Sequence, residues 1–198
     1  MGQPWSNATR YNLAQFRGLA GYDIPHRFVV SGAYEIPGKT ANKWVNAIVS
    51  NWSVSTIASF DSGLPYTVFL STDNENIGPP SGRYTEFPNV VGDPSVPNPG
   101  VFQWFNTAAF QIPAPYTKGT GGRNTFRADG FVNVDGAVYK RWPFAETRSV
   151  EFRSEFFNLA NHTTFATPNS ILGVPQFGTI TGTRNSGRQI QLALKLHF

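Results

Sequence analysis

The chain of 198 residues contains no cysteine, which excludes both disulfide bonds and thiolate metal sites. Charged residues are also scarce, at 14% against about 25% in an ordinary globular domain. No stretch approaches the ~20 apolar residues that a membrane-spanning helix requires. The N-terminal segment Met1 to Ser6 lacks the charged and apolar regions of a signal peptide. We therefore expect neither a spanning helix nor a secretion signal in this sequence.

Aromatic residues, by contrast, make up 15% of the chain, and glycine and proline occur 19 and 15 times. Such a composition favours an all-β protein with long, turn-rich loops. The net charge of +4 comes from scattered cations and not from a basic run, which is typical of a mildly basic solvated surface. Nucleic acid is therefore not an expected partner.

Five segments alternate apolar and polar residues with a period of two, which is the pattern of a β-strand. We predict strands near residues 26–36, 44–70, 130–142, 148–159 and 188–198. The connections alternate in length, short at 37–43 and 143–147 and long at 71–129 and 161–187. Outer-membrane β-barrels sort their loops in this way, with short periplasmic turns and long extracellular loops. The pattern predicts an antiparallel up-and-down meander, the C-terminal strands of a transmembrane β-barrel, that ends at the periplasmic side.

Each predicted strand has one apolar and one polar face. In a soluble protein the apolar face would point inward, whereas in a membrane barrel it points at lipid and the polar face lines the lumen. Glu151, Arg153 and Glu155 recur at every second residue and share a polar face, so we expect a lumen-facing ladder of ion pairs. Aromatic residues stand near several strand ends, as in the girdles at membrane interfaces: Tyr34, Trp44, Trp142, Phe144 and Phe198. Because aromatic residues also favour strands in general, this placement fits both interpretations.

Five strands cannot close a barrel, because the smallest single-chain forms have about eight. An open edge in lipid would leave backbone groups unpaired at a cost of several kcal/mol each. We therefore expect residues 1–198 to be the C-terminal part of a larger barrel, or to need partner strands.

Several short stretches, in their order and spacing, resemble one known family. They are His26–Gly32, Ser62–Thr67, Trp104–Phe110, Gly122–Asn124, Phe156–Leu159 with Asn161 and His162, and Arg188–Phe198. Together they resemble the C-terminal barrel region of TonB-dependent outer-membrane receptors. The closest likeness is to the Oar-like group, whose members often carry a carboxypeptidase-regulatory-like domain. The resemblance runs from about Tyr11 onward, and the family's TonB box, plug domain and earlier barrel strands are missing from it.

The resemblance implies a receptor or transporter segment in the bacterial outer membrane. In the full-length parent a scarce or large ligand would be taken up with TonB-coupled energy, and TonB would act only through the missing N-terminal region. The unknown extracellular ligand would first meet the loops 71–129 and 161–187. The other implied partners are outer-membrane lipid and the barrel-assembly machinery. That machinery would read the terminal strand through its alternating apolar residues Ile190, Leu192, Leu194, Leu196 and Phe198.

Motifs for catalysis and cofactor binding are weak. The three histidines, His26, His162 and His197, lie far apart without metal-ligand spacing. The glycine-rich stretch 119–123 lacks the ending of a phosphate-binding loop, and the acidic stretch 73–76 lacks the EF-hand pattern. We expect no cofactor and no enzymatic role, while a weak calcium site in the acidic loop stays open.

Two other functions fit parts of the pattern. A soluble β-sandwich could bind carbohydrate, with Trp104 and Tyr116 as platforms for sugar rings. A β-rich hydrolase could use Glu151 or Glu155 as catalytic carboxylates. An arginine between the two carboxylates would hold both ionised, which suits an ion-pair ladder better than acid–base catalysis.

Overall fold

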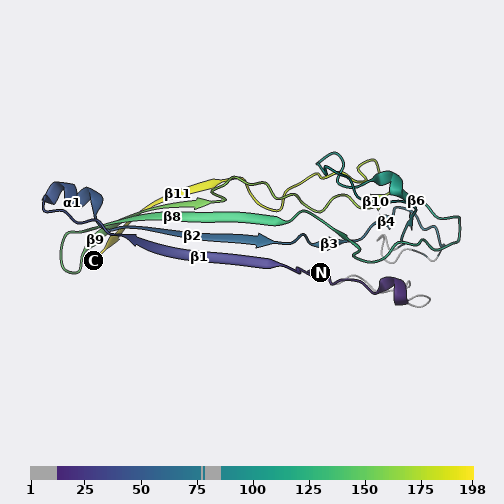
Figure 1. Cartoon of the computed structure of the whole chain (residues 1–198), viewed down its shortest axis with the longest axis horizontal. Coiled ribbons are helices and arrows are strands. Elements are labelled where there is room, and N and C mark those ends of the chain that lie inside the picture. Colours follow the sequence, from purple (N-terminus) through teal and green to yellow (C-terminus); the bar gives the residue numbers. More distant parts are fainter. Residues whose placement is uncertain (1–12, 77, 79–85) are drawn as a thin grey trace. The chain divides into compact units, whose positions relative to one another are not determined.

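The computed structural model describes residues 13–76, 78 and 86–198, so the N-terminal segment and part of the long predicted loop lie outside the described residues. The chain divides into two compact units (Figure 1). Residues 26–62, 131–164 and 185–198 form what we call the strand unit. The described parts of 13–25, 63–130 and 165–184 form the loop unit.

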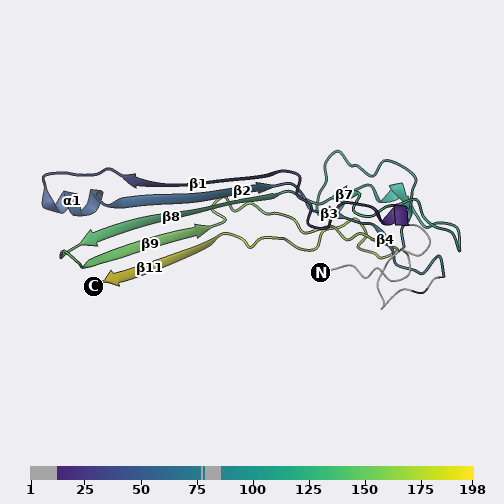
Figure 2. The same ribbon diagram turned by 90° about the horizontal axis from the view of Figure 1, so that it is seen from below.

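The strand unit is one five-stranded antiparallel sheet, and its strands are neighbours in the order in which they follow along the chain (Figure 2). They are β1 (Arg27–Ile36), β2 (Trp52–Asp61), β8 (Phe131–Pro143), β9 (Ser149–Phe157) and β11 (Gln189–His197). The pairing is continuous, so that Arg27 lies opposite Asp61 and Asp61 lies opposite Phe131. The predicted all-β fold and its up-and-down meander are confirmed.

The prediction of a strand near 44–70 is wrong at both ends. Lys43–Val49 form a helix, α1, and β2 covers only the middle of the predicted range. The helix begins at Asn42, whose side chain accepts hydrogen bonds from the backbone N–H groups of Trp44 (3.0 Å) and Val45 (3.3 Å). Beyond β2 the backbone at Gly63 runs so close to the carbonyl of Ala128 that only glycine fits, and residues 65–66 then pair with residues 126–127 in a separate two-stranded sheet.

Neither α1 nor any other helix among the described residues is long and apolar enough to cross a membrane. In the loop unit, regular structure is limited to three short strand pairs and two 3₁₀ turns, Leu13–Phe16 and Thr107–Ala109, within the residues described. The pairs are β3 (Pro65–Tyr66) with β7 (Phe126–Arg127), β4 (Phe69–Leu70) with β10 (Ile171–Leu172), and β5 (Asn89–Val90) with β6 (Phe110–Gln111). The β4–β10 pair is parallel and joins the two long connections.

The loop unit has a hydrophobic core of its own, built largely from aromatic rings. Its buried members are Tyr66, Val68, Phe105, Ala109, Phe110 and Ala128. Phe177, from the second long connection, packs edge-on against Phe105 at 5.1 Å and Phe110 at 5.7 Å between ring centroids. The long connections are therefore packed together and are not separate flexible loops.

Candidate functional site

One face of the sheet is apolar from β1 to β11. Phe28 lies opposite Phe60, Phe60 opposite Val132, and Phe152 opposite Leu194, so the apolar positions of neighbouring strands coincide. Most of these side chains are exposed, Leu194 to 72% of its surface. A β-sandwich buries such a face against a second sheet, whereas a membrane barrel turns it towards lipid.

The opposite face carries the predicted ladder of charges. The Arg153 guanidinium lies 3.4 Å from the Glu155 carboxylate and 3.9 Å from that of Glu151. It also stacks over the ring of Tyr139, 4.7 Å from the centroid, and His197 lies 3.9 Å from Glu151. The structure thus brings the three predicted residues together on one face, while the assignment of this face to a lumen stays a prediction.

A second polar cluster, absent from the sequence-based predictions, joins β8 to the segment that follows β9. The Asp135 carboxylate accepts hydrogen bonds from the Asn133 side chain (2.9 Å) and from the backbone N–H of Asn158 (2.8 Å). Asn158 is buried and has a positive φ of 53°. Its side chain donates to the carbonyls of His162 and Ser186 and accepts from the N–H of His162. An asparagine directly after a strand was the available signal, because asparagine tolerates this conformation better than most residues.

Lys140 is the unexpected member of the apolar face, where it lies opposite Trp52. Its side chain is almost fully buried, and Nζ donates a hydrogen bond to the carbonyl of Ser50. The same Nζ lies 5.3 Å from the ring centroid of Trp52 and 5.6 Å from that of Trp142. The alternation of β8 places Lys140 between Val138 and Trp142, so the sequence contained its position but not the contacts that keep it there.

The five aromatic residues predicted as a girdle lie on the side of the sheet where the short connections are. Tyr34 is near the end of β1, Trp142 near the end of β8, and Trp44 belongs to α1 in the connection between β1 and β2. Phe144 and Phe198 follow β8 and β11 and are exposed. Because neighbouring strands are antiparallel, these strand ends lie at the same end of the sheet, as an aromatic girdle requires.

Lys140→Met is expected to lower the free energy of unfolding by about 1–3 kcal/mol, because the buried Ser50 carbonyl loses its charged donor. Urea-induced unfolding of the protein in phospholipid vesicles measures this loss. Lys195→Met is the matched control, since Lys195 is an exposed lysine of the polar face, and it is expected to change stability by less than about 0.5 kcal/mol. Equal losses in the two variants would contradict a special role for Lys140.

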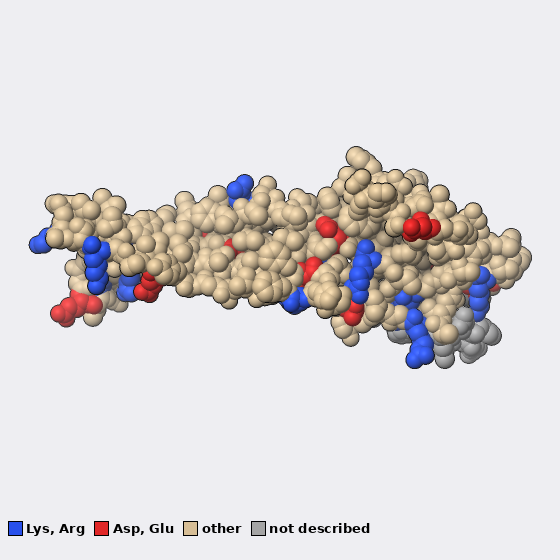
Figure 3. Space-filling model, in the orientation of Figure 1, with Lys and Arg blue, Asp and Glu red and all other residues tan. Residues whose placement is uncertain are grey.

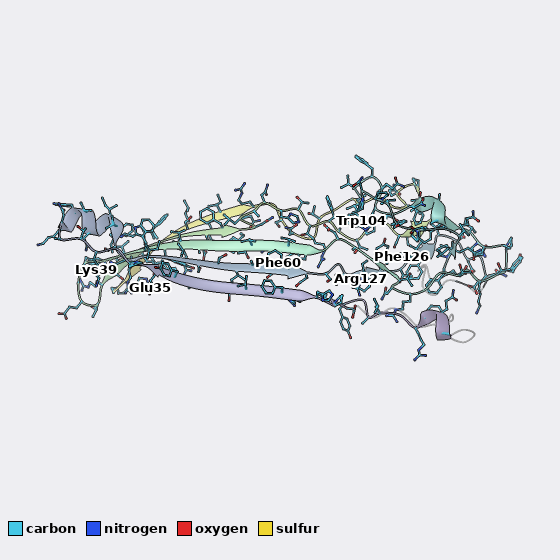
Figure 4. All side chains as sticks on the ribbon, viewed as in Figure 1. Glu35, Lys39, Phe60, Trp104, Phe126 and Arg127 are labelled. Atoms are coloured by element: carbon cyan, nitrogen blue, oxygen red, sulfur yellow. The ribbon has the colours of Figure 1, made fainter. Side chains whose placement is uncertain are left out.

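In the loop unit, ionic and aromatic contacts fix the chain segments to one another. Arg127 forms an ion pair of 2.5 Å with Asp23 and donates to the carbonyl of Gly63 at 3.0 Å (Figure 4). Trp104 packs edge-on against Phe165 and lies on the aromatic core, so it is not a free platform for a sugar, whereas Tyr116 is 77% exposed.

Figure 3 shows few charged side chains along the visible face between the two ends of the strands.

The buried carboxyl group of Glu86 holds the acidic stretch 73–76, for which the sequence leaves a weak calcium site open. Glu86 accepts hydrogen bonds from the backbone N–H groups of Asn74 (2.7 Å) and Glu75 (3.0 Å). Burial and the neighbouring carboxyl group of Asp73 raise the pKa of Glu86 to about 7, against the lowering effect of those two donors. Among the described residues, no three side chains gather that could hold a metal ion.

The raised pKa makes the loop around Glu86 sensitive to pH. Because the folded-state pKa lies above the unfolded value of 4.5, its contribution to stability is complete below pH 4.5 and is lost as the pH rises through about 7. We expect the amides of Asn74 and Glu75 to be protected from hydrogen exchange about tenfold less at pH 8 than at pH 5, after correction for intrinsic rates. Glu86→Gln imitates the protonated carboxyl group and should remove this difference, and a pH dependence that persists in it would exclude Glu86 as the cause.

A protein-family model described as an outer membrane beta barrel domain matches residues 2–191. The match includes β1, β2, β8 and β9, the beginning of β11 and both long connections. Comparisons with curated proteins and with solved structures found no match.

Proposed function

The chain belongs to the outer membrane beta barrel domain family and is located in the bacterial outer membrane, and from this premise we propose that it is a segment of a receptor barrel. In the full-length parent this barrel takes up a scarce or large ligand with TonB-coupled energy, as the resemblance to the Oar-like group suggests. TonB itself would engage a region outside this segment. The unknown extracellular ligand would bind the loop unit.

The observation that carries the proposal is the packed core of the loop unit. Three segments far apart in the sequence, 13–25, 63–130 and 165–184, contribute to one unit. The strand ends that lead into these segments lie at the same end of the sheet, because Arg27 pairs with Asp61 and Gln189 pairs with Phe157. A folded unit of this size presents preformed surfaces, which suits ligand capture better than short connecting loops would.

We place the segment at the C-terminal end of a larger barrel. In the sheet as described, β1 and β11 each have one strand neighbour, and lipid does not tolerate unpaired edges. In the proposed barrel β11 closes the circle against the first strand. Its apolar residues, from Ile190 to Phe198, form the signal for the barrel-assembly machinery, and Glu151, Arg153 and Glu155 line the lumen.

We also propose that the segment has no enzymatic role. Glu151 and Glu155 both face the Arg153 guanidinium at ion-pair distances, an arrangement that suits a ladder of ion pairs better than a pair of catalytic carboxylates. The soluble carbohydrate-binding alternative loses support from the exposed apolar face and from the packing of Trp104.

A nutrient screen tests uptake. Cells with and without the full-length gene are grown on iron chelates, saccharides and peptides, each as the limiting source, and we expect the deletion to abolish growth on one class. Collapse of the proton-motive force with an uncoupler should stop uptake of that nutrient. Uptake that continues after the collapse would contradict TonB coupling, and unchanged growth on all three classes would contradict the receptor function.

Heat-modifiable mobility in gel electrophoresis tests the barrel separately. The full-length product in outer-membrane fractions should migrate differently before and after boiling, as folded barrels do. A product recovered entirely in the water-soluble fraction as a monomer would exclude the proposed barrel.

A further inference from the structure

Helix α1 exposes four apolar side chains on one of its sides. Trp44 and Ile48 are 85% and 69% exposed, and Val45 and Val49 lie beside them. Residues at these spacings form one continuous strip on a helix. No residue of α1 is buried, so its apolar strip has no cover within the strand unit as described. Such a strip in water would be unfavourable, which calls for a partner that covers it.

Three side chains of the sheet nonetheless hold the helix, each through a carbonyl group at its C-terminal end. The indole Nε1 of Trp52 donates to the carbonyl of Ile48 at 2.7 Å, and that of Trp142 donates to the carbonyl of Ala47 at 2.9 Å. Lys140 Nζ donates to the carbonyl of Ser50, the residue that ends the helix. These donors satisfy carbonyl groups that every helix leaves free at its C-terminus.

The three donors all come from the same face of the sheet, and this determines where α1 lies. Trp52, Lys140 and Trp142 all project from the apolar face of the sheet, since Trp52 lies opposite Lys140 and Trp142 is two residues further along β8. The helix is therefore attached to the face that the barrel family turns towards lipid. The connection between Ile36 and Trp52 also brings Gly38 against the carbonyl of Val49, where a Cβ atom would collide.

We propose that α1 is an interfacial membrane anchor, which lies on the periplasmic leaflet of the outer membrane with Trp44, Val45, Ile48 and Val49 in the region between head groups and acyl chains. The periplasmic assignment rests on the proposed barrel, in which the short connections face the periplasm. At seven residues, about 10 Å long, the helix is too short to span a bilayer but suits a position in its surface.

Two observations select phospholipid as the occupant. Trp52 and Trp142, which project from the apolar face of the sheet, attach α1 to that face through the carbonyls of Ile48 and Ala47. The connection 37–51 contains two exposed lysines, Lys43 and Lys39 (the latter labelled in Figure 4), and no acidic residue, which complements the phosphate groups of lipid head groups. Tryptophan is also the residue most typical of the membrane–water boundary.

The absence of cysteine allows single-thiol probes to test the anchor. Ile48→Cys lies on the apolar strip, Ala47→Cys lies on another side of the same helix, and Leu194→Cys lies on the apolar face of β11. Each variant of the full chain is labelled with an environment-sensitive fluorophore in vesicles of phosphatidylethanolamine and phosphatidylglycerol. The vesicles contain lipids with spin labels either near the head group or deep in the acyl chain.

We expect the probe at residue 48 to be quenched several-fold more by the shallow spin label than the probe at residue 47. The probe at residue 194 should be quenched mainly by the deep label. Should Ile48→Cys fail to fold, Trp44→Cys on the same strip takes its place.

The outcomes separate the anchor from the barrel. Lipid quenching at residue 194 with a probe at 48 that is open to aqueous iodide would overturn the anchor and leave the barrel intact. A probe at 48 shielded from both iodide and spin labels would show that protein covers the helix, which also overturns the anchor. An absence of lipid quenching at residue 194 would overturn the membrane assignment on which the anchor rests.

Discussion

Leu192→Arg is expected to destabilise the membrane-inserted protein by about 2–4 kcal/mol, the cost of an arginine on the lipid face near the bilayer midplane. Leu192 lies in the middle of β11, is 65% exposed, and projects from the apolar face. A guanidinium group at this position either enters the hydrocarbon or distorts the bilayer to reach water. A loss of this size is a large fraction of the stability of a typical domain.

The neighbouring residue supplies a control of the same chemistry. Gln191→Arg places the same side chain on the polar face, opposite Glu155 in the β9–β11 register. We expect this variant to fold as well as the parent, because the new cation faces a carboxylate. Urea titration of both variants in phospholipid vesicles, read by heat-modifiable mobility, gives the two free energies of unfolding. Equal tolerance of arginine at the two positions would contradict the assignment of the faces.

Asn158→Ala is expected to lower the free energy of unfolding by about 3–4 kcal/mol. The substitution removes three side-chain hydrogen bonds, two to the carbonyls of His162 and Ser186 (3.0 Å each) and one from the N–H of His162 (2.9 Å). Asn158 is buried, so water cannot fully replace the lost partners. The segments that leave β9 and enter β11 would lose the hydrogen bond from Asn158 to the Ser186 carbonyl, one of the polar links between them.

Asn161→Ala controls for the backbone. Asn161 has a positive φ of 50°, close to the 53° of Asn158, so alanine is equally strained at both positions. Its exposed side chain accepts one hydrogen bond, from the N–H of Arg188. We expect a loss of only about 1 kcal/mol there, measured by the same urea titration. If the two losses were equal, backbone strain and not the hydrogen-bond network would explain the effect.

The strands of the sheet could be predicted because their alternation continues for nine residues or more. The helix at 43–49 could not, since apolar residues at 44, 45, 48 and 49 fit a helical period and a strand segment almost equally well. The helix is fixed by the cap at Asn42, by Trp52 directly after it, and by Trp142, which reaches the helix C-terminus from the distant strand β8. Local pattern does not contain such long-range hydrogen bonds.

The candidate site could be predicted where the charged residues follow the two-residue period of a strand, and it could not be predicted elsewhere. Glu151, Arg153 and Glu155 follow the period of β9, and they meet in the structure as expected. Lys140 breaks the rule for its face, and only the two indole rings and the Ser50 carbonyl explain it. Glu86 carries no sequence signal at all, because its environment comes from a stretch of chain about twelve residues away.

The parallel pairing of β4 with β10 has a consequence for the order in which the protein matures. Phe69 and Ile171 are neighbours in space but about a hundred residues apart in sequence, so their contact is among the slowest kinds to form. The loop unit cannot complete its core until residues 165–184 have arrived, because Leu172 and Phe177 pack against it. In the proposed barrel, whose long connections are extracellular, these aromatic side chains would cross the membrane before they pack. Under that proposal, folding of the loop unit would be a late step of biogenesis.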